Sequence, residues 1–88
     1  MEEFMNDLAR KNPLRLRREA AGMTRADVAR RSGSSYPALN QLENCLARRM
    51  SSKTASRLAA LYNTTPETLQ DEFAAFRDGL SEWEREAA

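Results

Sequence analysis

Residues 24–43 constrain the fold of this chain more than any other stretch, because they mark the ends of two short helices. Thr24 and Asp27 have the spacing of a capping box, in which the two side chains close the amino end of a helix. Gly33 follows, and glycine readily takes the left-handed conformation that ends a helix. The spacing predicts a first helix over about residues 25–32.

A second helix is predicted directly after this turn, over about residues 36–44. Ser35 can cap it, and Leu39 and Leu42 are spaced to lie on one buried face. Two short helices joined by a few residues that include a glycine form the helix-turn-helix motif. DNA-binding proteins place the second helix of this motif, the recognition helix, in the major groove.

Start and stop signals elsewhere in the chain predict further helices, and no strand pattern is found. A helix is predicted over about residues 12–21, where an Asn-Pro pair suits the cap and first position. Another is predicted over about 51–62, with Asn63 as a left-handed end, and a last one starts at Pro66. Residues 3–11 form a short helix or an arm. The predicted fold is all-α, with five or six helices.

Four groups of residues have the order and spacing of a known family of helix-turn-helix domains. They are Leu14, Arg18 and Gly22-Met23-Thr24; Ala29 and Gly33-Ser34-Ser35; Gln41-Leu42-Glu43-Asn44; and Leu58-Ala59 with Thr64-Thr65-Pro66-Glu67-Thr68-Leu69. Through them the chain resembles the phage-repressor family, of the Cro and lambdoid-repressor type. The resemblance implies a lambda-repressor-like fold that binds operator DNA as a dimer and regulates transcription, more often as a repressor than as an activator.

The resemblance also divides the chain into three parts. Residues 1–11 form an N-terminal arm or short helix, and residues 12–69 form the helix-turn-helix DNA-binding domain. Residues 70–88 extend beyond the usual DNA-binding core as a helical extension, which we expect to mediate dimerisation.

The large apolar residues of the C-terminal segment recur every three or four positions, as in a heptad stripe. They are Leu69, Phe73, Phe76, Leu80 and Trp83. The first two are expected to be buried within the domain, and Phe76, Leu80 and Trp83 are expected to form a homodimer interface. The alternative is a helix break at Gly79, with Ser81 capping a new helix that folds Trp83 back onto its own domain.

The charge of the chain is unevenly distributed along its length. The total is only +1, but residues 10–57 carry twelve Lys and Arg against three acids, which gives +9. Residues 1–9 carry −3 and residues 58–88 carry −5. Positive charge therefore falls on the helix-turn-helix segment, which suits a polyanion such as duplex DNA. A charged surface that is merely solvated is the alternative.

The outer face of the recognition helix holds the candidates for reading bases. By the resemblance, the base-reading positions fall on Tyr36, Pro37 and Gln41. Asn40 and Gln41 carry the amide group that pairs with adenine in the major groove. Pro37 offers only an apolar ring, which can contact a thymine methyl group. Alternatively, Tyr36 and Pro37 only start the helix.

Candidate phosphate contacts need only a positive charge or an N–H group at the right place. The amino end of the helix at Thr24 and Arg25 offers backbone N–H groups and a cation. By the resemblance, the end of the recognition helix and the basic loop that follows it also contact phosphates. The candidates are Thr24, Arg25, Asn44, Arg48, Arg49 and Lys53.

Two further positions are singled out by the resemblance. Arg18 and Glu43 match a pair that ties the first helix of the domain to the recognition helix, so we expect a partly buried ion pair; two solvated charges are the alternative. Cys45 stands where the family commonly has glycine. Because cysteine accepts a positive φ poorly, the loop is expected to close differently. As a lone cysteine, it is expected to be packed and inert, although a redox switch is conceivable.

Several function classes are disfavoured by the composition. The chain has no histidine, one cysteine and no phosphate-binding glycine loop, so we expect no enzyme, no metal site and no cofactor. An acidic N-terminus and the lack of a membrane-length apolar run predict a cytoplasmic protein. The resemblance to phage repressors implies that it is bacterial or phage-encoded.

The partners expected are double-stranded DNA, with two half-sites, and a second copy of the chain; no membrane and no small-molecule ligand are expected. The alternative function is a protein-interaction module with the same fold: an antitoxin, an anti-repressor or a phage protein that binds host transcription machinery.

Overall fold

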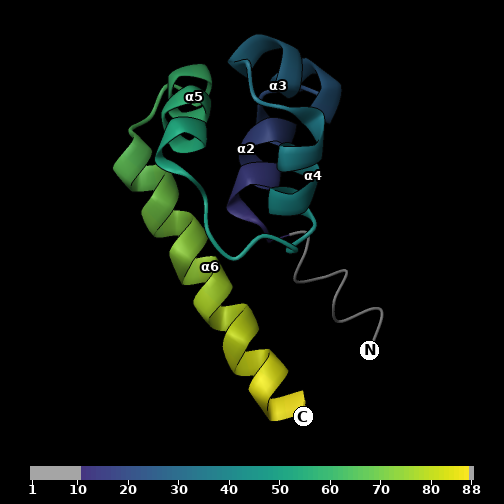
Figure 1. The fold of residues 1–88 in the computed structure, drawn as a ribbon, viewed down its shortest axis with the longest axis vertical. Helices are drawn as coiled ribbons and strands as arrows, with labels where there is room; N and C mark the ends of the chain where they lie inside the picture. Colours follow the sequence, from purple (N-terminus) through teal and green to yellow (C-terminus); the bar gives the residue numbers. More distant parts are fainter. Residues whose placement is uncertain (1–10, 88) are drawn as a thin grey trace.

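The computed structural model describes residues 11–87, with side chains described up to Gly79. Within this part the chain forms helices and no strand, so the predicted all-α fold is confirmed. The arm or short helix predicted over residues 1–11 lies, except for Lys11, outside the described residues. The helices are α2 (Pro13–Ala20), α3 (Arg25–Ser32), α4 (Tyr36–Glu43), α5 (Ser52–Tyr62) and α6 (Pro66–Ala87) (Figure 1).

The helices begin and end with capping residues at the positions that the sequence predicts. The Thr24 hydroxyl accepts from the backbone N–H of Asp27, and the Asp27 carboxylate accepts from the N–H of Thr24, both at 3.1 Å. Gly33 and Asn63 end α3 and α5 in the left-handed region, with φ of 76° and 56°. The Ser35 hydroxyl accepts from a backbone N–H in the first turn of α4 at 3.2 Å. These local bonds fix where α3 ends and where α4 begins.

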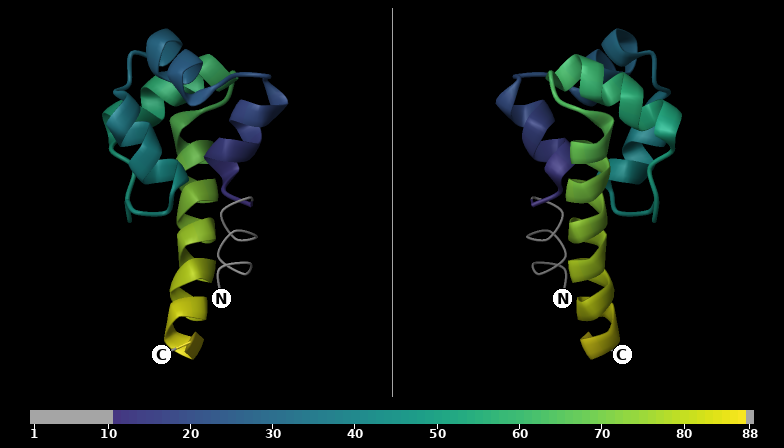
Figure 2. Two further views of the ribbon diagram at one scale, coloured as in Figure 1. Left: turned by 90° about the vertical axis from the view of Figure 1, so that its right-hand side faces the viewer. Right: turned by 90° about the vertical axis from the view of Figure 1, so that its left-hand side faces the viewer.

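The helices pack around one apolar core. α3 packs against α4 and α5, while α6 packs against α2 and α5 (Figures 1 and 2). Because α4 directs its leucines into this core, its opposite face remains on the surface. The buried apolar residues are Leu14, Val28, Leu39, Leu42, Met50, Ala55, Leu58, Ala59, Leu69 and Phe73.

The last helix, α6, runs without a break over 22 residues. At about 1.5 Å per residue it is about 33 Å long, and its C-terminal half extends beyond the other helices (Figures 1 and 2). The alternative break at Gly79, with a new helix starting at Ser81, is therefore wrong. One glycine costs a helix only about 1 kcal/mol, and the glutamate, alanine and leucine residues around it favour the helix.

The loop after α4 corrects a second expectation. Cys45 has a φ of 64°, so it takes the left-handed conformation that a glycine would take. The N–H of Leu46 donates to the carbonyl of Gln41 at 2.9 Å, as in a Schellman motif. The Arg77 guanidinium donates to the carbonyl of Cys45 at 3.0 Å. These bonds hold the cysteine in the left-handed region, and the loop closes as a glycine-containing loop does.

Candidate nucleic-acid interface

The outer face of α4 carries the residues predicted to read bases. Pro37 and Gln41 are exposed, and Tyr36 has 46% of its surface exposed. Asn40 lies on the same face, one turn after Tyr36, and is half-buried. All four candidates therefore lie away from the core, where the predicted base contacts require them.

Behind α4, one buried carboxylate binds two arginines. The side chain of Glu43 is 1% exposed. Arg18 Nε donates to the two carboxylate oxygens of Glu43 at 3.0 and 3.1 Å, and Arg25 Nε donates to Oε1 at 3.3 Å. Arg18 Nη1 also donates to the carbonyl of Met23 at 3.0 Å. The structure thus brings Arg18 and Glu43 together as the sequence predicts, and it adds Arg25, so that α4 is tied to both α2 and α3.

Arg25 also holds the outer side of α4. Its Nη1 donates to Asn40 Oδ1 at 2.9 Å, and its Nη2 donates to Asn44 Oδ1 at 3.0 Å. One guanidinium therefore contacts α4 at Asn40, Glu43 and Asn44. The sequence predicts phosphate contacts for Arg25 and Asn44; in the structure, three of the five N–H groups of the Arg25 guanidinium donate within the protein, one of them to Asn44.

Asn12 links the start of α2 to the end of α4. It is fully buried, and its Oδ1 accepts from the N–H of Leu14 at 3.0 Å as a helix cap. Its Nδ2 donates to the carbonyls of Leu42 and Glu43 at 2.9 and 3.3 Å. The sequence predicts the cap but not the second role, because the partners of Nδ2 lie about thirty residues away.

The remaining candidates for phosphate contact lie on the surface. Arg48, Arg49 and Lys53 are exposed, and none forms an ion pair with another residue between 11 and 79. Thr24 is exposed at the amino end of α3, where its side chain closes the capping box. Three cations without a described carboxylate partner therefore lie in and just after the loop that follows α4.

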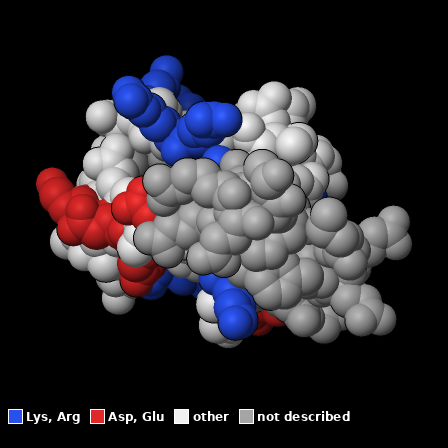
Figure 3. All heavy atoms as spheres, turned by 90° about the horizontal axis from the view of Figure 1, so that it is seen from below, with Lys and Arg blue, Asp and Glu red and all other residues white. Residues whose placement is uncertain are grey.

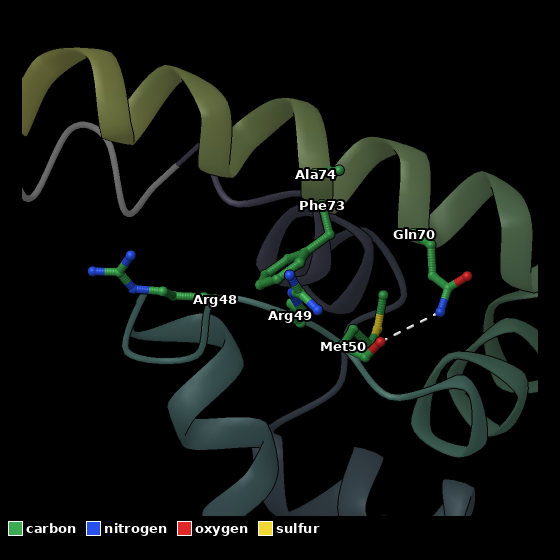
Figure 4. Close-up of a pocket in the computed structure, with 6 residues that line it drawn as sticks. All are labelled: Arg48, Arg49, Met50, Gln70, Phe73 and Ala74. Atoms are coloured by element: carbon green, nitrogen blue, oxygen red, sulfur yellow. Dashed lines mark hydrogen bonds between the residues drawn. The ribbon is translucent and has the colours of Figure 1, made fainter.

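Two polar side chains of α6 support this loop. Arg77, which is buried, donates to the carbonyl of Cys45, and Gln70 Nε2 donates to the carbonyl of Met50 at 3.3 Å (Figure 4). Since both ends of the loop are bound to α6, the loop holds a defined backbone position. Between the loop and α6 lies a hollow of about 210 Å³. Its lining residues are Arg48, Arg49, Met50, Gln70, Phe73 and Ala74 (Figure 4).

Arg77 and Gln70 belong to no motif, and the sequence analysis missed both. The signal available for Arg77 is weak: it is one of two arginines in an acidic helix, and it lies four residues after the buried Phe73. A second missed contact is the ion pair of Arg17 with Glu72, at 2.9 Å, which ties α2 to α6. The Glu72 carboxylate beside Arg17 raises the pKa of that guanidinium.

Some of the basic residues in the helix-turn-helix segment form ion pairs within the protein. Of the eleven Lys and Arg residues in 11–57, five form ion pairs with carboxylates of the described part of the chain. Seen from below, Lys and Arg gather at the upper edge of the molecule and again at the lower edge, and Asp and Glu gather mainly at the left (Figure 3). The exposed acids of α6 include Glu67, Asp71 and Asp78. The largest group of cations on this face therefore lies apart from the largest group of acids (Figure 3).

The residues predicted for a dimer interface all lie on α6. Phe76 is half-buried, whereas Leu69 and Phe73 are fully buried in the domain, as expected. Leu80 and Trp83 continue the same helix, and their side chains lie outside the described part.

This arrangement, two short helices joined by a capped turn and packed at the edge of a small helical bundle, defines a helix-turn-helix domain. A family model described as a helix-turn-helix domain matches residues 13–73, so the chain belongs to that family. The family is one of DNA-binding domains and is not typically enzymatic. Neither the comparison with curated proteins nor the comparison with solved structures found a match. No helix within residues 11–87 is long and apolar enough to cross a membrane.

Proposed function

We propose that the chain binds specific sequences in double-stranded DNA and regulates transcription, as a repressor of the phage-repressor type. The observation that carries this proposal is the exposed face of α4 together with the exposed cations Arg48, Arg49 and Lys53, which form no ion pair with another residue between 11 and 79. Side chains that reach base edges and cations that reach phosphates are the two parts of a specific protein–DNA interface. A protein-only binding module needs no such pairing of features.

The proposed active form is a homodimer held by α6. In the sequence, the apolar spacing that includes the buried Phe73 and the half-buried Phe76 continues to Leu80 and Trp83. The C-terminal half of α6 extends beyond the other helices (Figure 1). Acidic residues on its other faces would lie away from DNA. A symmetric dimer of this kind binds two half-sites about 34 Å, or one helical turn, apart.

Selection of bound sites from a random DNA pool, followed by gel shifts in excess competitor DNA, tests this proposal. The expected result is a site with two related halves. Gln41→Ala should relax the base preference at one position in each half and weaken binding by about 1–3 kcal/mol. The matched control is Ser56→Ala, on the exposed side of α5, which should bind like the parent. Failure to prefer any site over random DNA contradicts the proposal and favours a protein-interaction module.

A further inference from the structure

Arg25 fixes the orientation of two amide groups on the recognition helix. Its Nη1 and Nη2 reach the side-chain oxygens of Asn40 and Asn44 at 2.9 and 3.0 Å, while its Nε holds the buried Glu43. The Arg25 side chain is only 24% exposed, and the buried carboxylate of Glu43 binds its Nε, so the guanidinium has little freedom to move.

The chemistry of the guanidinium decides which amide atom faces it. A guanidinium has five N–H donors and no acceptor, whereas an amide has one oxygen acceptor and one NH₂ donor. If Asn40 were turned over, its NH₂ group would oppose Arg25, donor against donor. The oxygen of Asn40 therefore faces Arg25, and the NH₂ group points away from it. Asn40 lies on the outer face that it shares with Tyr36 and Gln41.

We propose that Arg25 is a positioning residue that sets Asn40 as a hydrogen-bond donor, and that Asn40 reads guanine. The inference rests on the proposed function, since it names the base class that α4 recognises. Bidentate pairing with adenine needs the amide oxygen and the NH₂ group of Asn40 turned side by side toward the base, whereas the oxygen is turned toward Arg25 at 2.9 Å and the NH₂ group is turned away from it. Guanine presents two acceptors, N7 and O6, in the major groove. This replaces the expectation from sequence that Asn40 pairs with adenine.

The first test is Asn40→Asp, analysed by site selection and by gel shift. Aspartate has the shape of asparagine and still offers an oxygen to Arg25, but its outward atom becomes an acceptor. The parent should select guanine at one position in each half-site, and Asn40→Asp should select cytosine there, because cytosine N4 is a donor. Affinity of this variant for the parental site should fall about tenfold or more.

The second test is Arg25→Lys, which keeps the charge but removes the planar fork that holds two amides at once. The amide of Asn40 is then free to turn over. The affinities for sites with adenine and with guanine at that position should therefore lie within about threefold of each other, whereas a good bidentate contact gives a much larger difference. Arg30→Lys is the matched control, because Arg30 is an exposed arginine of α3 that pairs with Asp27. It should keep the parental preference for guanine.

The outcomes separate this inference from the proposed function. Suppose that the parent binds a specific sequence but selects no guanine at the position whose base preference changes in Asn40→Asp. This result overturns the inference and leaves the proposed function standing. Equal weakening of all sequences by Asn40→Asp also overturns it, since the amide would then donate to a phosphate. If the parent prefers no sequence over random DNA, the proposed function fails, and the inference fails with it.

Discussion

The arginines behind the recognition helix and those beside it have opposite surroundings. Arg18 and Arg25 are 14% and 24% exposed and share the buried carboxylate of Glu43. Arg48 and Arg49 are exposed in the loop after α4 and have no described carboxylate partner. Both pairs belong to the same basic segment of sequence. The difference shows that part of the positive charge near the helix-turn-helix motif holds the recognition helix in place, and we propose that the exposed part binds DNA phosphates.

The largest expected effect tests the inner arginines. Glu43→Gln should lower the free energy of unfolding by about 3–5 kcal/mol, because removing one partner leaves two partly buried guanidinium groups without their carboxylate. Urea unfolding measures this change. The control is Glu67→Gln, an exposed acid at the start of α6, for which about 0.5 kcal/mol or less is expected. A cost below about 1 kcal/mol for Glu43→Gln would mean that the two groups of arginines do not differ.

A smaller loss of stability is expected when the link between α2 and α4 is removed. Asn12→Ala leaves the carbonyls of Leu42 and Glu43 without a buried donor and should cost about 2–3 kcal/mol. Asn12→Ser restores the cap on α2 but not the second link, so it should recover about 1 kcal/mol of this cost. Thermal or urea unfolding of the two variants checks this order. Full recovery by serine would show that only the cap matters.

The pH dependence of stability reports on the same buried network. Burial, and then the negative charge of Glu43, raise the pKa of Tyr62 from 10.0 to about 12. The neutral phenol is therefore favoured in the folded state, and its stabilising contribution is complete below pH 10. This contribution should disappear as the pH rises from 10 to about 12, since the unfolded chain ionises first. Urea unfolding at several pH values should show this decrease in the parent and a weaker pH dependence in Tyr62→Phe.

The smallest expected effect concerns the loop that carries the exposed arginines. Cys45 has a side chain and a left-handed backbone conformation, which strains the backbone. Cys45→Gly relieves this strain and should raise the free energy of unfolding by about 1 kcal/mol. Asn63→Gly, at the end of α5, should gain less, because asparagine tolerates this conformation better. Urea unfolding compares the two. A decrease in stability in Cys45→Gly would show that packing of the thiol outweighs the backbone strain.

Reactivity of the same cysteine gives an independent test of the loop. Burial raises the pKa of the Cys45 thiol, so the fraction of reactive thiolate at pH 7–8 is reduced. A thiol reagent should modify folded Cys45 more slowly than the same residue in urea. Reaction at least as fast in the folded protein would favour the redox role over inert packing.

The parts of the fold that depend on local signals were predictable from sequence. The capping box at Thr24, the glycine at Gly33 and the left-handed Asn63 involve neighbours within four residues, and the bounds of α3 and α5 follow from them. The contacts that the sequence analysis missed join residues far apart in the chain. Gln70 to Met50, and Arg77 to Cys45, span 20 and 32 residues. Such pairs depend on how the helices pack, which no local spacing reveals.

In the candidate site, too, features that depend on local spacing were predictable, and contacts between helices were not. The sequence predicts that Tyr36, Pro37 and Gln41 share the outer face of α4, because helical periodicity alone decides this. It also predicts a phosphate contact for Arg25, from its place at a helix start. The contacts of Arg25 with Asn40, Glu43 and Asn44 were not predictable, since they require the angle at which α3 and α4 pack. A charged residue near a motif is assigned a role reliably only when its partners are known.

The salt dependence of DNA binding tests the contrast between the two groups of arginines most directly. Removing one cation that binds a phosphate should reduce the slope of log K against log salt concentration by about 0.9. We expect Arg48→Ala and Arg49→Ala each to show this reduction, to weaken all DNA sequences alike and to unfold at the same urea concentration as the parent. Arg30→Ala, which removes an exposed arginine of α3, should leave the slope unchanged. An unchanged slope in both loop variants, or an equal reduction in Arg30→Ala, would contradict the account.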